Sequence, residues 1–275
     1  MRFRRPGVQM TTVVSLAVVL ITTPARASLT AAVLHQIGVE APAEARVPMA
    51  VQLHDDAGGL QSLQQAIGGR PAIMIFADYT CQSLCGAVLT MAATGLLQSG
   101  LKPNADFRLI VVGLDPKDGV SEAQAMKRAQ VDGSLQPAST FLLADAGTKQ
   151  IADAVGYRYA YDSENDQFAH PAAVFVLAAD GRVVRVLSGL ALDPGSLRLA
   201  LVEAGAGRVG TFADHVRLLC YGFDPAAGTY TAAIGRWLAI AAAATLLVLG
   251  ACFMLLMRAP AASGCRPPTV PPKRP

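Results

Sequence analysis

Apolar and polar positions between residues 47 and 205 follow two different repeats that alternate along the chain. Short, nearly continuous apolar runs predict buried strands, and apolar positions that recur every three or four residues predict helices. The strands are predicted at 47–53 (a strand or a hairpin), 72–76, 107–114, 139–143, 172–177 and 182–187. The helices are predicted at 86–98, 149–155, from Ser121 onward with a Ser121/Gln124 capping box, and after Asp193.

This order of elements predicts an α/β domain with a mixed central sheet. Strands alternate with helices, and a terminal hairpin turns at Asp180-Gly181 before the last helix. Two cysteines, Cys81 and Cys85, lie at the first junction between a strand and a helix. That order is typical of a thioredoxin-like fold, and as an argument from topology it supports the fold more than the function. We therefore predict a leader at 28–46 and a thioredoxin-like domain at 47–205.

The N-terminal residues 1–27 resemble a secretory signal peptide. Three arginines precede an apolar stretch at 11–23, which ends at the small-residue site Ala25-Arg26-Ala27. An uncleaved anchor is the alternative, but the apolar stretch is short for a membrane span.

A second apolar segment near the C-terminus predicts a transmembrane helix at 234–257. Residues 237–257 carry no charge, and a span needs roughly 20 apolar residues. The tail at 258–275 contains four basic residues and no acidic one, so the positive-inside rule places it in the cytoplasm. With a juxtamembrane linker at 206–233, the main domain is predicted in the periplasm, tethered to a bacterial inner membrane.

Charge and cysteine content exclude two classes of protein. The chain has a net charge of +3, but residues 28–257 carry 15 basic and 20 acidic side chains. The exported part therefore lacks a basic surface for nucleic acid. Five cysteines, of which Cys252 and Cys265 lie in the span and the tail, are too few for a disulfide-stapled scaffold.

The spacing of Cys81 and Cys85 suits either metal binding or redox chemistry. Helix N-termini favour anions, so we expect lowered thiol pKa values and a larger thiolate fraction. A C-x-x-x-C pair can direct two sulfurs to one metal, and it can also form a disulfide if the Cβ atoms come within range. Two unrelated buried cysteines are the third interpretation.

His170 is the best candidate for a third metal ligand. It lies just before the predicted strand at 172–177, and in a thioredoxin-like sheet that loop lies beside the first cysteine loop. A lone histidine is more often structural, so this assignment is a hypothesis. Two thiolates and an imidazole suit copper in either oxidation state and can accept zinc. The other histidines, His35, His54 and His215, lack partner spacing and are predicted at the surface.

Three motifs together resemble the Sco/SenC family over residues 45–205: the segment Phe76-Ala77-Asp78-Tyr79-Thr80-Cys81-x3-Cys85, the segment 113–118 (GLDPKD), and His170. The resemblance implies a thioredoxin-like fold and copper bound by Cys81, Cys85 and His170. It also implies delivery of copper to a copper-bearing subunit of cytochrome c oxidase, or to another copper-handling protein. Asp115 matches an acidic residue that supports the ligands rather than binding the metal.

The chain departs from the family pattern at two positions. Gln82 and Gly86 stand where family members commonly have proline after each cysteine. Neither change removes a ligand, but both affect copper affinity and thiol potential. The C-terminal tether also differs from the N-terminal anchor usual in the family. Cys220 is predicted as a packed thiol near the membrane, with a relay of copper or a mixed disulfide as the alternatives.

Two functions therefore stay open. The first is a copper metallochaperone that binds Cu(I) or Cu(II) and passes it to a partner. The second is a thiol–disulfide oxidoreductase in which Cys81 attacks and Cys85 resolves the mixed disulfide. His170 favours the metal, and only the second function would make the chain an enzyme. A peroxidase lacks support because no threonine–cysteine–arginine constellation surrounds the pair.

Overall fold

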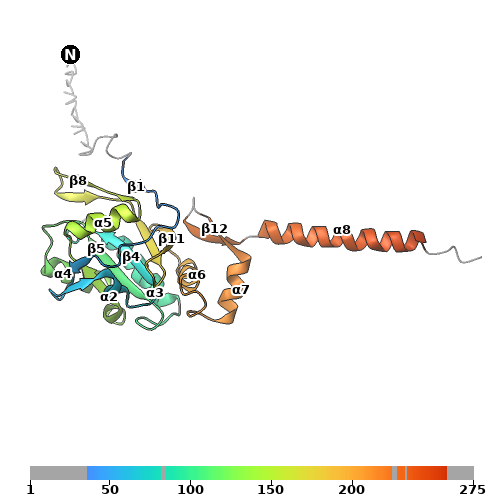
Figure 1. Ribbon diagram of the computed structural model, residues 1–275, viewed down its shortest axis with the longest axis horizontal. Helices are drawn as coiled ribbons and strands as arrows, with labels where there is room; N and C mark the ends of the chain where they lie inside the picture. The colour runs from blue at the N-terminus through green and yellow to red at the C-terminus, as the bar shows by residue number, and fades with distance from the viewer. Residues whose placement is uncertain (1–35, 82–84, 225–227, 233, 259–275) are drawn as a thin grey trace, which may run out of the picture.

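A five-stranded mixed sheet forms the centre of the fold in the computed structural model, which describes residues 36–81, 85–224, 228–232 and 234–258. The strand order is β11–β10–β4–β5–β6 (Figure 1). The strands β4 (Ala72–Ala77), β5 (Arg108–Gly113) and β6 (Ser139–Leu142) are parallel to one another. β10 (Ala173–Leu177) is antiparallel to both β4 and β11 (Val183–Ser188). The predicted α/β class and mixed sheet are confirmed.

The sheet has two buried faces because side chains alternate along each strand. On β4, Ile73 and Ile75 belong to one apolar cluster, and Met74 and Phe76 belong to the other. The first cluster is completed by residues of α3 (Cys85–Gln98), α4 (Val120–Gln130) and α6 (Pro194–Ala204). The second is completed by α2 (Leu63–Ile67) and α5 (Ala146–Ala154). Burial on both faces explains why the central strands are continuous apolar runs.

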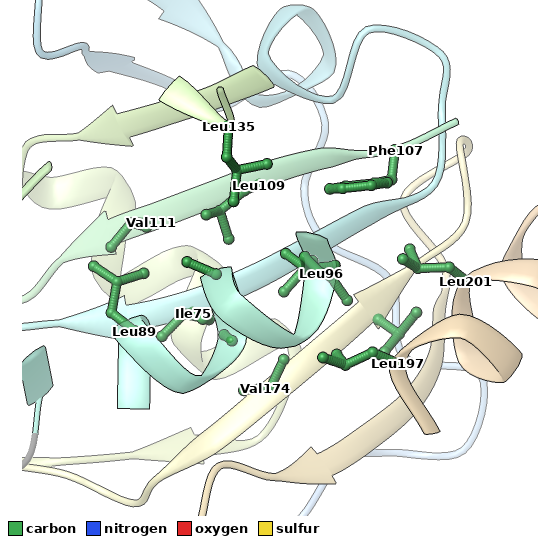
Figure 2. Packing of buried hydrophobic residues seen from close by; sticks show 14 of the residues in the cluster. Ile75, Leu89, Leu96, Phe107, Leu109, Val111, Leu135, Val174, Leu197 and Leu201 are labelled. Atoms are coloured by element: carbon green, nitrogen blue, oxygen red, sulfur yellow. The ribbon is translucent and has the colours of Figure 1, made fainter. Parts of the chain in front are cut away.

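The helix that follows the cysteine loop packs directly on the first face. Figure 2 shows Leu89 and Leu96 of α3 lying over the side chains of Ile75 and Val174, with Leu197 of α6 beside them. Each of these five side chains is at most 2% exposed. Full burial of such a side chain contributes about 1.5–3 kcal/mol to the stability of the fold. The packing therefore holds α3, and with it Cys85 at its first position, in place on the sheet.

Helix α4 begins earlier than predicted, and the predicted Ser121/Gln124 capping box is wrong. The N-cap is Gly119, whose backbone N–H donates to Glu122 Oε2 at 2.9 Å. Ser121 instead donates from its hydroxyl to the same carboxylate. The side chain of Glu122, three positions after the N-cap, therefore caps the first turn of α4.

Shorter elements surround the sheet. The predicted strand at 47–53 forms only at its end, as β2 (Gln52–His54) paired with β3 (Leu60–Ser62). The 3₁₀ helix η1 precedes β6, and two further antiparallel pairs flank the sheet. These elements are η1 (Gln136–Ala138), β1 (Gly38–Val39) with β7 (Tyr157–Arg158), and β8 (Ala160–Asp162) with β9 (Gln167–Ala169).

The segment predicted as a juxtamembrane linker contains regular structure packed on the domain. It holds α7 (Phe212–Cys220) and a hairpin of β12 (Tyr221–Asp224) and β13 (Thr229–Ala232). Arg198 of α6 joins α7 through two hydrogen bonds to Asp214, at 2.8 and 2.6 Å. The guanidinium holds the pKa of Asp214 well below its usual range. Apolar contacts add to this ion pair, since Leu218 of α7 and the hairpin residues Phe223 and Tyr230 pack against the first apolar cluster.

The predicted span falls in α8 (Ile234–Arg258), which projects away from the sheet in Figure 1. Over the residues that the structure describes, no helix is long and apolar enough to cross a membrane. The transmembrane assignment thus stays a prediction. The predicted signal peptide, the leader up to residue 35 and the tail beyond residue 258 lie outside the described residues.

Candidate metal and thiol site

The two cysteines lie where β4 leads into α3, as the sequence predicts. Cys85 is the first residue of α3 and is 6% exposed, and Cys81 is half-buried against the same apolar cluster. No disulfide joins the two sulfurs in the structure. Burial raises the pKa of the Cys85 thiol, and a hydrogen bond with Cys81 raises it further. The expected lowering of thiol pKa values is therefore wrong for Cys85, because loss of hydration outweighs the field of the helix terminus.

His170 contacts Cys85 from a distant segment of the chain. It follows β9 and precedes β10, and its Nε2 lies 3.0 Å from Cys85 Sγ. Burial lowers the pKa of the imidazole, which favours the neutral form that ligates metals. The structure thus brings Cys85 to both Cys81 and His170, and His170 lies 85 positions after Cys85 in the chain.

Tyr157 orients the imidazole, and the sequence analysis missed it. Its hydroxyl donates to the carbonyl oxygen of Pro171 at 3.0 Å and lies 2.8 Å from His170 Nδ1. Because a phenol has only one hydrogen, the hydroxyl accepts from Nδ1–H, and Nε2 keeps its lone pair toward Cys85. The ring is 2% exposed and stacks on Phe76 with centroids 4.3 Å apart. Three tyrosines occur between residues 157 and 161, and no local pattern singles out the first.

Tyr157→Phe should change the tautomer of His170 while leaving the sheet intact. Without the hydroxyl, Nδ1–H keeps only the longer contact to the carbonyl oxygen of Pro171, at 3.3 Å, and that carbonyl loses its shorter donor. We expect a smaller Nδ1–H population in the ¹⁵N NMR spectrum of the imidazole and a stability loss of about 1–2 kcal/mol. Tyr161→Phe is the control, since that ring is 46% exposed. Identical imidazole signals in Tyr157→Phe and the unmodified chain would show that the hydroxyl does not set the tautomer.

Three buried carboxylates lie beneath the cysteine loop. Asp78, Asp115 and Asp118 are 0%, 2% and 6% exposed, and an oxygen of each lies within 4.8 Å of the others. Asp118 accepts from the backbone N–H of Tyr79 at 2.8 Å, and burial raises the pKa of its carboxyl group. Asp115 accepts from Lys117 N–H at 2.8 Å. Asp115 thus belongs to a cluster that sequence analysis did not foresee, and its supporting role toward the ligands stays a prediction.

Lys117 lies in the loop between β5 and α4, and it links that loop to the β8–β9 hairpin, which directly precedes His170. Its ammonium group contacts Asp166, and it lies 5.2 Å from the ring centroid of Tyr161. It also lies 3.7 Å from Asp115. Lys117 and Asp166 are exposed, so solvent screens this ion pair and its contribution to stability is small.

The remaining candidate residues lie elsewhere. His54 is exposed on β2, as predicted, whereas His215 is half-buried and donates to the carbonyl of Thr211 at 2.8 Å. Cys252 is exposed on α8, and Cys220 ends α7. His35 and Cys265 lie outside the described residues.

Comparison with solved structures shows the fold. A putative electron transfer protein from Aquifex aeolicus VF5 is 21% identical, with a TM-score of 0.53 over 60% of this chain and 95% of that chain. A putative electron transport protein from the same organism is 20% identical, with a TM-score of 0.51 over 60% and 99%. ScoI of Arabidopsis thaliana, solved with copper bound, is 18% identical, with a TM-score of 0.47 over 56% and 94%.

Comparison with curated proteins gives no match. The sequence model of the SCO1/SenC family, in contrast, matches residues 40–201. That range includes the whole central sheet and all three candidate ligands. The match agrees with the resemblance of the cysteine, aspartate and histidine motifs. The chain therefore belongs to the SCO1/SenC family.

Proposed function

We propose that the chain binds copper through Cys81, Cys85 and His170 and delivers it during assembly of the copper centre of a cytochrome c oxidase. The observation that carries the proposal is the 3.0 Å separation of Cys85 Sγ and His170 Nε2, with Cys81 hydrogen-bonded to Cys85. Sulfur and imidazole donors are the ligands that copper prefers. Copper is the cargo here, so the ligands must also be able to release it.

The donors lie at the end of the sheet, with Cys81 before α3, Cys85 at the first position of α3 and His170 between β9 and β10. Cys81 is half-buried and thus open to a partner's ligands, whereas Cys85 is 6% exposed within the first apolar cluster. This asymmetry suits ligand exchange, because a partner can displace the more exposed sulfur first. Membership of the SCO1/SenC family supports the cytochrome c oxidase as the client.

The predicted placement in the periplasm, tethered to the inner membrane by residues 234–257, is also part of the proposal. It rests on the signal-like residues 1–27 and on the basic tail without acidic residues.

A thiol–disulfide oxidoreductase is the second candidate. The hydrogen bond between Cys81 and Cys85 favours it, since the two thiols are already in contact. The raised pKa of Cys85 fits a resolving thiol better than an attacking one, which leaves Cys81 as the nucleophile. The contact between His170 and Cys85, however, is not required for thiol–disulfide exchange.

Copper stoichiometry of the reduced chain, measured beside His170→Ala, separates the two functions. We expect one tightly held copper per chain, and an affinity lower by more than about 10-fold in the variant, because loss of a supporting group alone typically costs about 10- to 100-fold. His54→Ala, at an exposed histidine on β2, should bind as the unmodified chain does.

Two results would count against the copper proposal. Equal affinity in His170→Ala and the unmodified chain would remove His170 from the ligand set. No tight copper, together with a Cys81–Cys85 disulfide that cycles readily with a thiol client, would assign the protein to the oxidoreductases.

A further inference from the structure

Asp78 makes contacts to both of the loops that supply the candidate ligands. It is the first residue after β4 and is 0% exposed. Its Oδ1 accepts from the backbone N–H and the hydroxyl of Thr80, at 3.1 and 3.2 Å. Its Oδ2 accepts from the backbone N–H of Phe168 at 2.9 Å. Thr80 directly precedes Cys81, and Phe168 lies two residues before His170.

The backbone of Asp78 adds two more contacts to the same loop. Its carbonyl oxygen accepts from Cys81 N–H at 3.3 Å, and its backbone also hydrogen-bonds to the Cys85 thiol. Every segment that carries a proposed ligand is thus hydrogen-bonded to this one residue. The connection between Asp78 and Phe168 spans 90 residues, and it is the only link of the five that joins the cysteine loop to the histidine segment.

We propose that Asp78 is a positioning residue that sets the separation between the cysteine pair and His170. The inference rests on the proposed copper site, which it deepens. Its carboxylate holds the β8–β9 hairpin against the cysteine loop, so that His170 Nε2 stays within bonding range of Cys85 Sγ.

The chemistry of the contacts requires a carboxylate. Three donors, from Thr80 and Phe168, converge on the two oxygens of this fully buried side chain. An asparagine side chain of the same shape has one oxygen and one NH₂ group, so at least one of the donors would face another donor. Such a mismatch cannot be repaired by water at a fully buried position.

Asp78→Asn also removes a negative charge from the surroundings of a bound cation, so weaker copper binding by itself does not separate a positional role from an electrostatic one. Readouts on the copper-free protein make that separation, because no cation is present in it.

The test compares Asp78→Asn with Asp166→Asn in the full chain. Asp166 lies in the β8–β9 hairpin, but it is exposed and pairs with Lys117. We expect copper affinity to fall about 10- to 100-fold in Asp78→Asn, and to change less than about 3-fold in Asp166→Asn. The copper-free, reduced proteins provide the second readout: the ¹⁵N shift of His170 Nε2 and the hydrogen exchange of the Phe168 amide. Both should change in Asp78→Asn alone.

Each outcome decides the inference. Unchanged or tighter copper binding in Asp78→Asn, or an unchanged Nε2 shift despite a faster-exchanging Phe168 amide, overturns it. If the unmodified chain binds no copper, the proposed function fails, and the copper-free readouts still decide whether Asp78 positions His170.

A second pair of variants applies if Asp78→Asn does not fold. Phe168→Ala keeps the amide donor, and Phe168→Pro lacks it. A changed Nε2 shift in the proline variant beyond that of the alanine variant supports the inference. Equal shifts in the two variants overturn it.

Discussion

Cys85→Ser is expected to abolish tight copper binding while the fold persists. Serine has nearly the same shape, so the 6% exposed position at the start of α3 still packs, but its hydroxyl is a poor ligand for a soft metal. Loss of a group that merely supports a ligand costs about 10- to 100-fold in affinity, and loss of the ligand itself costs more. We therefore expect at least about 100-fold weaker binding, measured by competition with a chromophoric Cu(I) chelator under reducing conditions.

The matched control is Cys252→Ser, at an exposed cysteine on α8 far along the chain from the site. It should bind copper as the unmodified chain does. Wild-type affinity in Cys85→Ser, with an unchanged thermal midpoint, would contradict the ligand assignment. Weak binding in both variants would place the copper elsewhere.

Gly156→Ala is expected to cause the largest loss of stability from a single methyl group. Gly156 has a φ of +64°, and a Cβ there would lie 2.0 Å from the carbonyl oxygen of Glu40. That segment is held close by the hydrogen bond from Glu40 N–H to the Gly156 carbonyl, at 2.9 Å. Backbone strain and the forced contact each cost about 1–3 kcal/mol, so the free energy of unfolding should fall by roughly 2–6 kcal/mol in denaturant titration.

Gly58→Ala isolates the backbone part of that effect. Gly58 has a φ of +81°, but no atom lies within 4 Å of a Cβ built on it. The left-handed conformation alone should cost about 1 kcal/mol. Equal losses in the two variants would mean that the chain near Glu40 moves aside without cost. Because Gly156 precedes Tyr157, the larger effect should also disturb the imidazole of His170.

Most of the sheet and the place of the cysteine pair were predictable from local sequence. The strands β4, β5, β6 and β10 are buried on both faces, so a short apolar run is enough to mark each of them. The edge strand β11 is only partly buried, and the hairpin turn at Asp180-Gly181 marked it instead. The α3 helix carries apolar residues at helical spacing, and Cys81 and Cys85 adjoin it in the sequence. The β8–β9 hairpin and α7 were not predicted, because these short segments attach to the domain through single contacts with distant residues. Phe168 N–H donates to Asp78, Arg198 pairs with Asp214, and Leu218 packs against the first apolar cluster.

The site itself was only partly visible in the sequence. The position of His170 before a strand suggested a ligand, but the roles of Tyr157 and Asp78 depend on contacts with residues distant in sequence. Tyr157 is one of three nearby tyrosines, and Asp78 is one of 20 acidic residues. What distinguishes them is burial together with a partner, and neither property is encoded locally.

The sequence by itself determined the order of strands and helices and the placement of the thiols at the start of a helix, since both follow from which residues are apolar. Only the tertiary structure decided that Cys85 Sγ and His170 Nε2 meet at 3.0 Å and that Asp78 joins their two loops. It also decided the direction of the Cys85 pKa, because the raising effect of burial depends on which residues pack around the sulfur.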